Sequence, residues 1–217
     1  MELYRLMTAG KISVAFAVRG RTAAEDFTWN LRNQTYPEKL MRYDEILHFW
    51  FEKTSPAPWF KKDDEFDRMI KERFANVHPA AVRCERFKWR VDPLGRLAEI
   101  IVLDQCSRNM YRNQPAAFAF DPLALAQEAI RAGVDNAFSN PRKLFLYMPF
   151  MHSESAVLHE IAVVLFSTPG MEKNLEYEQK HKAIIDRFGR YPHRNEILGR
   201  ESTAEELEFL DGPGSSF

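Results

Sequence analysis

The sequence contains few cysteines, almost no net charge and no long apolar run, and each shortage excludes a class of protein. The only cysteines among its 217 residues are Cys84 and Cys106, which provide neither a disulfide framework nor the spacing of a metal site. Lysine and arginine (30) balance aspartate and glutamate (31), so no overall field attracts nucleic acid or membrane. No apolar run approaches the roughly 18 residues that a membrane span needs. We therefore expect a reduced, cytoplasmic protein that contacts neither nucleic acid nor membrane.

Signals for helices recur from Tyr43 onward. Apolar residues return at helical spacing, and prolines and glycines mark the segments between them. Asp92-Pro93, Asp121-Pro122 and Asn140-Pro141 each combine a capping residue with a proline suited to the first helical turn. No segment shows persuasive strand alternation. The pattern predicts an all-α fold, an irregular α-α superhelix of stacked helical hairpins.

The chain is expected to have three parts. Residues 1–40 differ from the rest, and their apolar run at 12–18 is too short and too poorly flanked for a good secretory signal. We interpret them as a weakly ordered N-terminal extension, with Met41 as an alternative natural start. Residues 41–211 are expected to form a single helical domain, and residues 212–217 a flexible tail.

Two helix predictions in the second half of the chain bear on function. Pro149 is expected to stop a helix that begins near Asn140. The next helix is expected to begin at residues 152–154. Its inner face is predicted to carry four apolar residues: Val157, Ile161, Val164 and Leu165.

A first polar motif, Leu-Asp-Gln-Cys-Ser-Arg-Asn at residues 103–109, follows a strongly apolar helical run. Asp104 and Arg108 lie four residues apart, so they can form an ion pair on one helical face. Asp104 is expected to be largely buried, and a buried carboxylate needs a partner. Two interpretations stay open: a clamp between helices, or a carboxylate that orients an arginine or binds a cation. Cys106 is expected to be a buried, unreactive thiol.

A second polar motif, Met-His-Ser-Glu at residues 151–154, falls at a turn between helices. Ser153 and Glu154 suit the cap and first turn of the next helix, which is a complete structural explanation. A histidine at a turn also suits an acid, a base or a ligand, so His152 is a catalytic candidate. A metal site would need a third group, and the sequence has no HExxH or paired-histidine spacing, so we predict no metal.

The third motif, Arg187-Phe-Gly-Arg-Tyr-Pro-His-Arg-Asn195, is the most basic. Gly189 and Pro192 end any helix there, so its side chains are expected to project from a loop. Arginine forks bind carboxylate or phosphate, and Tyr191 can stack on a guanidinium group. Three interpretations stay open: ion pairs that join the C-terminal helices to the core, an anion-binding pocket, and a contact with a partner protein.

Together these motifs resemble a bacterial family catalogued as domain of unknown function 924. The resemblance spans about Tyr43 to Leu210. It rests on residues 103–109, Phe118-x-x-Asp121, Tyr147-x-Pro-Phe-Met-His-Ser-Glu154, and the basic motif with Leu198-Gly-Arg200. It implies a tetratricopeptide-like α-α superhelix but no established activity. The family more often has an aromatic residue and a proline in place of Cys106 and Ser107, which argues against a catalytic Cys106.

The working hypothesis is that the three motifs meet at one pocket for an acidic ligand, a phosphate or carboxylate on a metabolite or peptide. Arginines would hold the anion, acidic side chains would orient the arginines, and histidines would donate hydrogen bonds. The predicted clamp is Arg108, Arg190 and Arg194; the orienting acids are Asp104 and Glu154; the histidines are His152 and His193. The wider set of predicted ligand-binding residues adds Asn109, Arg187, Asn195 and Arg200.

Two alternatives come from other functional classes. One is a hydrolase that uses His152 or His193 as acid or base with Glu154 or Asp104, with or without a divalent metal. The other is a scaffold that binds a partner protein, in which the polar motifs are purely structural. The sequence identifies no cofactor and predicts no oligomeric state.

Overall fold

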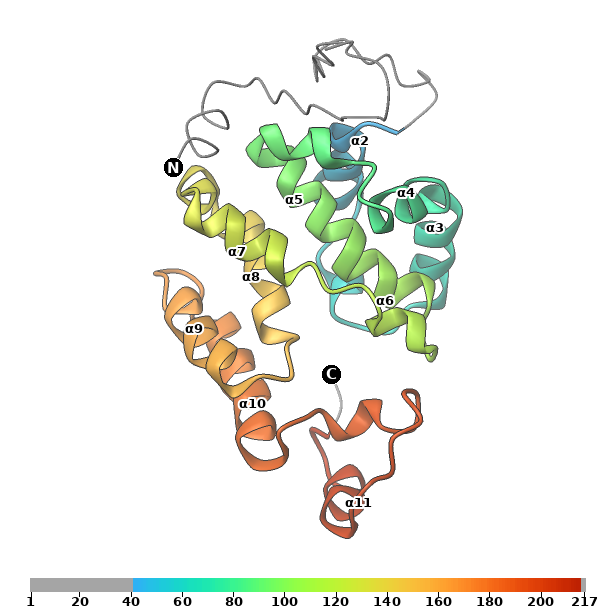
Figure 1. Ribbon diagram of the computed structural model, residues 1–217, viewed down its shortest axis with the longest axis vertical. Helices are drawn as coiled ribbons and strands as arrows, with labels where there is room; N and C mark the ends of the chain where they lie inside the picture. Colours follow the sequence, from blue (N-terminus) through green and yellow to red (C-terminus); the bar gives the residue numbers. More distant parts are fainter. Residues whose placement is uncertain (1–40, 216–217) are drawn as a thin grey trace, which may run out of the picture. The chain divides into compact units, whose positions relative to one another are not determined.

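A computed structural model of the chain describes residues 41–215, which are coloured in Figure 1. These residues form helices joined by turns and include no strand, which confirms the predicted all-α class. The expected N-terminal extension, residues 1–40, lies outside the described residues, as do the last two residues of the expected tail. Within the described part of the chain, no helix combines the length and the apolar character needed to cross a membrane.

The regular elements follow one another closely along the chain. The α-helices are α2 (Tyr43–His48), α3 (Asp64–Phe74), α4 (Val77–Val82), α5 (Pro93–Ile101), α6 (Ser107–Met110), α7 (Leu123–Arg131), α8 (Asn140–Met151), α9 (Ala156–Phe166), α10 (Glu172–Phe188) and α11 (Ala204–Leu210). The π-helical turns are η1 (Phe49–Lys53) and η4 (Val102–Cys106). The 3-10 turns are η2 (Ala57–Trp59), η3 (Phe87–Val91), η5 (Pro115–Phe118), η6 (Val134–Ala137) and η7 (Pro192–Arg194).

Asp92-Pro93 begins α5 as the sequence predicts, whereas Pro122 precedes the first residue of α7 and Asp121 lies one position further back. Asp92 accepts a hydrogen bond from the backbone N–H of Leu94 at 2.8 Å, and Asp121 accepts one from Leu123 at the same distance. The third such pair behaves differently. Asn140 is already the first residue of α8, and its Nδ2 donates to the carbonyl of Pro169 at 2.9 Å. Asn140 therefore joins the start of α8 to the turn after α9 instead of capping its own helix.

The prediction that Pro149 stops a helix is wrong. Helix α8 continues to Met151 with Pro149 inside it, and residues 144–151 are all buried. A proline there removes one backbone hydrogen bond, but the surrounding apolar packing maintains the helical turn. The extra turn places His152 directly after the helix end.

The predicted inner face of α9 is largely wrong, since Leu165 packs against the core but the other three predicted residues are exposed. The side chains of Val157 and Val164 are 71% and 73% exposed, whereas Ala162 and Phe166 are fully buried. His159 on the buried face forms a 2.6 Å contact with Glu178 of α10, and neither side chain is exposed. The polar pair and the small alanine thus determine which face of α9 packs inward.

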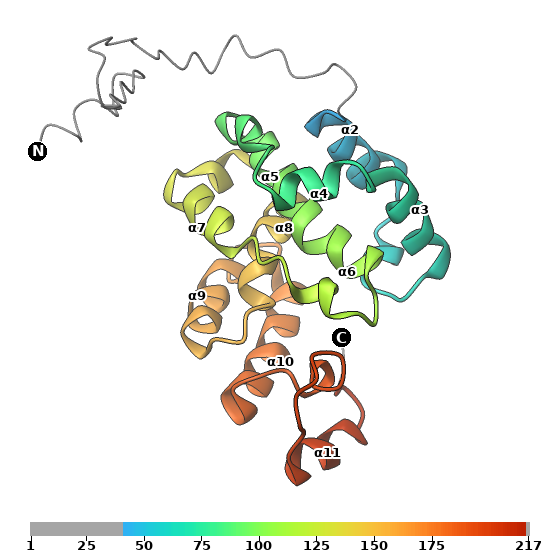
Figure 2. The ribbon, with the colours of Figure 1, turned by 45° about the vertical axis from the view of Figure 1, so that its right-hand side comes forward.

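Helix α5 continues through η4 into α6 and runs through the middle of the described unit (Figure 1). It packs against α2, α7 and α8, while α8 packs against α9, and α9 against α10. Large aromatic side chains fill this core, including Trp50, Phe74, Phe145 and Phe166. A smaller cluster of Ile184, Ile185 and Tyr191 packs where α10 gives way to the segment that leads to α11 (Figure 2). This segment brings the basic motif back toward the end of α8.

Candidate functional site

The site begins at Asp104, in the π-helical turn η4 between α5 and α6. Such a turn widens the helix locally and often occurs at functional positions. The Asp104 residue is only 4% exposed, so its carboxylate depends on protein donors. It accepts hydrogen bonds from Gln105 Nε2 at 2.6 Å and from Arg108 Nε at 3.1 Å. The predicted ion pair with Arg108 and the predicted burial of Asp104 are both confirmed.

His152 is the third partner of Asp104. Its Nδ1 lies 2.8 Å and 2.9 Å from the two carboxylate oxygens. Burial alone would raise the pKa of Asp104, but the interactions with His152 and Arg108 outweigh it and hold the pKa well below its usual range. Burial, reinforced by the charge of Arg108, lowers the pKa of His152 to about 4. At neutral pH the pair is therefore an ionised carboxylate and a neutral imidazole.

Arg194 reaches the same place from η7. Its Nη1 donates to the carbonyl of His152 at 3.1 Å, and its guanidinium lies over the ring of Tyr191 at 4.2 Å. It also lies over the ring of Phe118 at 4.9 Å, and Arg108 lies over that ring at 5.3 Å. The two predicted clamp arginines thus share one aromatic ring, although they are more than eighty residues apart in sequence.

Neither of these arginines uses all its donors. Arg194 is 7% exposed, and burial followed by the nearby charge of Arg108 lowers its pKa to about 10, so it stays protonated at neutral pH. Its Nε is buried without a partner, and its Nη2 makes no hydrogen bond to any described residue. Both Nη groups of Arg108 are equally unpaired within residues 41–215. These donors are available for an anion.

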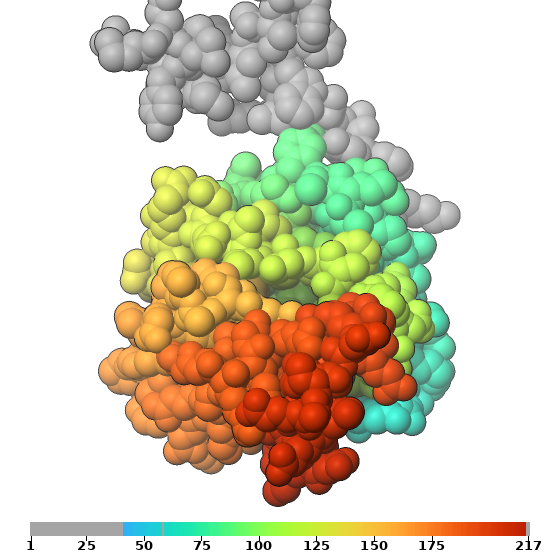
Figure 3. Space-filling view, turned by 60° about the horizontal axis from the view of Figure 1, so that its bottom comes forward, coloured from blue at the N-terminus to red at the C-terminus, as the bar shows by residue number. Residues whose placement is uncertain are grey.

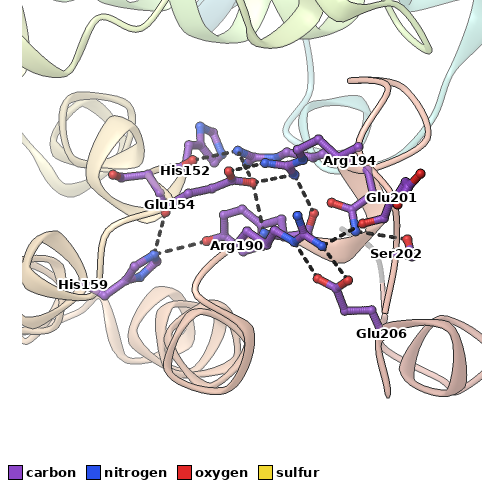
Figure 4. A network of polar contacts seen from close by, with 12 residues as sticks. His152, Glu154, His159, Arg190, Arg194, Glu201, Ser202 and Glu206 are labelled. Atoms are coloured by element: carbon purple, nitrogen blue, oxygen red, sulfur yellow. Dashed lines mark hydrogen bonds and ion pairs between the residues drawn. The ribbon is translucent and has the colours of Figure 1, made fainter. Parts of the chain in front are cut away.

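Glu154 joins the turn after α8 to the C-terminal segment, as Figure 4 shows. Its carboxylate accepts two hydrogen bonds from Arg200, at 2.6 Å and 3.0 Å, and one from the backbone N–H of Tyr191 at 3.0 Å. The distance from Glu154 to Arg194 is longer, 3.7 Å. Glu154 thus accepts hydrogen bonds from Arg200 and forms only the longer ion pair with Arg194.

Several predicted ligand-binding residues have other partners. Arg190 makes two hydrogen bonds to Glu206 of α11, at 2.6 Å and 2.7 Å, and turns toward that helix in Figure 4. Arg187 pairs with Glu205 on the same helix at 2.8 Å. Arg190, predicted as part of the clamp, is thus held by the strongly acidic start of α11, where Glu206 is almost fully buried.

The two predicted asparagines also lie in structural contacts. Asn109 donates to Asp67 of α3 at 2.8 Å, on the side of α6 that faces that helix. Asn195 is fully buried and donates to Ser202 at 3.0 Å. The structure therefore brings neither amide to the arginine pair.

His193 remains close to the cluster. Burial first, and then the charges of Arg194 and Arg108, lower its pKa to about 4. Its ring lies 5.5 Å from that of Tyr191, and its Nδ1 is buried with no hydrogen-bond partner among the described residues. It stays a candidate ligand-binding group, and no carboxylate among the described residues hydrogen-bonds to it and orients it as a base.

Phe118 is the site residue that reasoning from chemistry missed. An aromatic residue in the 3-10 turn η5 carries no polar signal, and only its place in the family motif pointed to it. The structure shows its role, because both guanidinium groups lie over its ring. Cys106, by contrast, is fully buried, and burial with the nearby charge of Asp104 raises the pKa of its thiol, which fits the predicted inert cysteine.

The surface of the described unit carries a hollow. Figure 3 shows the hollow between the yellow-green segment near residues 115–125 and the orange-red segment beyond residue 190. Phe118 and Arg194 belong to these two segments. No group of three or more metal-ligating side chains with suitable geometry occurs within the described residues.

The comparisons place this arrangement in a family. The family described as bacterial protein of unknown function (DUF924) matches residues 46–214. The chain belongs to this family. The solved structure of a protein of unknown function, ATU0120 from Agrobacterium tumefaciens, is 40% identical to this DUF924 chain with a TM-score of 0.74. The similarity covers 78% of this chain and 97% of that chain. A comparison with curated proteins found no match. The DUF924 match includes the whole cluster around Asp104, and it confirms the predicted family.

Proposed function

We propose that the protein binds a small oxyanion, a phosphate or carboxylate group of a metabolite or peptide, between Arg108 and Arg194. The observation that carries this proposal is the pair of guanidinium groups on the single ring of Phe118, with unpaired nitrogens on both. Like charges held close together in a partly buried site repel each other, and an anion between them would relieve that repulsion. Arginine forks match the oxygens of such an anion.

The carboxylates nearest to the two arginines share their oxygens with other donors. Asp104 accepts from His152 as well as Arg108, and Glu154 accepts from Arg200. Arg194 therefore has no carboxylate closer than 3.7 Å, although it is almost fully buried. A buried cation with so little compensation is costly to retain for stability alone, which favours a ligand-binding role.

Isothermal titration with inorganic phosphate tests the proposal. We expect Arg108→Gln and Arg194→Gln each to weaken binding by about tenfold or more, because each removes a charged donor to the anion. Arg187→Gln is the matched control: the same change in an exposed arginine that pairs with Glu205 should leave the affinity unchanged. Equal affinity in the wild type and both site variants would overturn the proposal.

A second candidate function is hydrolysis with His152 as general base, favoured by one observation. Asp104 holds Nδ1 of the ring, and Nε2 makes no hydrogen bond to any described residue. A carboxylate that orients an imidazole in this way is the arrangement of a base and its positioning group. Ser107 Oγ is already occupied by His78 and the carbonyl of Leu103, so the nucleophile would be water. A screen of phosphate and carboxylate esters, with and without divalent cations, tests this candidate.

Three expectations from the sequence stay predictions. They are a tetratricopeptide-like superhelix, a cytoplasmic location and a scaffold role. The exposed valines of α9 are the feature that a scaffold could use. A binding role for the arginine pair does not depend on any of them.

A further inference from the structure

We infer that the site selects oxyanions that carry a hydroxyl proton of their own, such as hydrogen phosphate or a 2-hydroxycarboxylate, over oxyanions without one, such as sulfate. This inference rests on the proposed function and specifies the class of its ligand. Its basis is the side of His152 that faces away from Asp104.

The geometry around Asp104 places an imidazole and a guanidinium next to each other. One carboxylate oxygen, Oδ1, lies 2.8 Å from His152 Nδ1 and accepts from Arg108 Nε at 3.1 Å. His152 Nδ1 and Arg108 Nε thus contact the same oxygen, and the remaining nitrogens, the outer ones, do not bond to it. These outer nitrogens are Nε2 of the ring and the two Nη groups of the guanidinium, and none bonds to a described residue. Arg194 adds its Nη2, because its guanidinium lies over the same Phe118 ring as that of Arg108.

The hydrogen-bond pattern determines what Nε2 can do. An ionised carboxylate only accepts hydrogen bonds, so Nδ1 must carry the proton of the neutral ring. Nε2 then has a lone pair and can only accept. The lowered pKa of His152 supports this state, since burial and the charge of Arg108 oppose a second proton on the ring. The site thus presents charged donors and one acceptor side by side.

A ligand that satisfies this set needs both an anionic oxygen and a donor. Hydrogen phosphate supplies both, because one of its oxygens keeps a proton at neutral and mildly alkaline pH. Sulfate has the same tetrahedral shape and, at mildly alkaline pH, the same charge, but no proton. It would place an oxygen lone pair against the lone pair of Nε2, and unsatisfied polar contacts of this kind are costly. A 2-hydroxycarboxylate meets the same requirement through its hydroxyl group, whereas a simple carboxylate does not.

Isothermal titration of the full chain with matched pairs of small ligands tests the inference. The pairs are phosphate with sulfate, at a mildly alkaline pH where both are dianions, and glycolate with acetate. We expect the proton-bearing member of at least one pair to bind about tenfold more tightly. A preference in the first pair alone assigns a phosphate ligand, and a preference in the second alone assigns a hydroxy acid.

The variant His152→Asn isolates the acceptor. Its Nδ2 can take the place of Nδ1 and still donate to Asp104, while nothing replaces Nε2. We expect the preference within the pair to fall to about twofold or less, with binding of the aprotic anion retained. His48→Asn, the same change at an exposed histidine that contacts Glu52, should keep the wild-type preference.

The outcomes separate the two proposals. Equal binding of both members in each pair by the wild-type protein overturns the inference and leaves anion binding intact. No binding of any of the four ligands overturns both. The wild-type ratios alone decide the matter if His152→Asn fails to fold.

Discussion

At the scale of single residues, the site depends on one buried carboxylate. Asp104 is buried, remains ionised and holds both His152 and Arg108 through hydrogen bonds. The sequence predicted the Arg108 contact, because four residues separate the two on one helix. It could not identify His152 as the second partner, because the contact joins residues 48 positions apart through the packing of α5 and α8.

The buried histidines predict how stability depends on pH. The pKa values of His152 and His193 are lowered to about 4, and that of His181 to about 3, by burial first in each case. An unfolded chain takes up these protons below about pH 6.5, so it binds more protons than the folded protein there. Stability should therefore be full above about pH 6.5 and fall toward pH 4.

Urea unfolding at about pH 7.5 and pH 5 measures this effect. We expect the free energy of unfolding to be lower at the acidic value by roughly 1–2 kcal/mol for each histidine. His152→Asn should reduce the difference by one such contribution. An unfolding free energy that is the same at both pH values would contradict the burial of neutral histidines.

At the scale of the helical elements, polar pairs decide orientations that hydrophobic periodicity does not reveal. The apolar residues of α9 lie all around the helix, so the pattern offered no unique inner face, and the predicted one contains Val157 and Val164. The buried contact between His159 and Glu178 joins α9 to α10 instead. Helix starts were better predicted, since Asp92 and Asp121 each accept a hydrogen bond from a backbone N–H two residues on and need no tertiary information.

The His159–Glu178 contact predicts that two glutamates, Glu178 and Glu160, contribute very differently to the free energy of unfolding. Glu178→Ala leaves His159 buried without its partner and should lower the free energy of unfolding by about 2–4 kcal/mol. Glu160→Ala removes an exposed partner of Lys182 on the same pair of helices and should change stability little. Urea unfolding of both variants is the measurement. Equal effects would show that the buried pair does not hold α9 against α10.

At the scale of the whole described unit, the site is assembled by the return of the C-terminal segment to the end of α8. Arg200 and Arg194 reach Glu154 and His152, which lie 46 and 42 residues earlier in the chain. Local patterns identified the three motifs, and the structure brings parts of all three together. They could not show which arginines are taken up by acidic side chains, because Arg187 and Arg190 pair with glutamates of α11 that follow them in sequence.

Removal of the Arg200–Glu154 contact should increase the mobility of the backbone around Tyr191. In Arg200→Ala, Glu154 loses both hydrogen bonds from that guanidinium, and its remaining bond to the amide of Tyr191 should weaken. We expect faster hydrogen exchange at that amide and in the neighbouring segment. Arg187→Ala, which removes an exposed pair with Glu205, is the control and should leave exchange at Tyr191 unchanged. Unaltered exchange in Arg200→Ala would show that this contact does not hold the segment.

The position of a bound anion tests the central claim most directly. We predict that a crystal structure of the protein at a phosphate concentration that saturates the titration shows one phosphate within hydrogen-bond distance of Nη atoms of both Arg108 and Arg194. The phosphate should lie in the hollow beside Phe118 and Nε2 of His152. If both guanidinium groups are free of anion under those conditions, or if phosphate occupies only a different surface, the account of this site is contradicted.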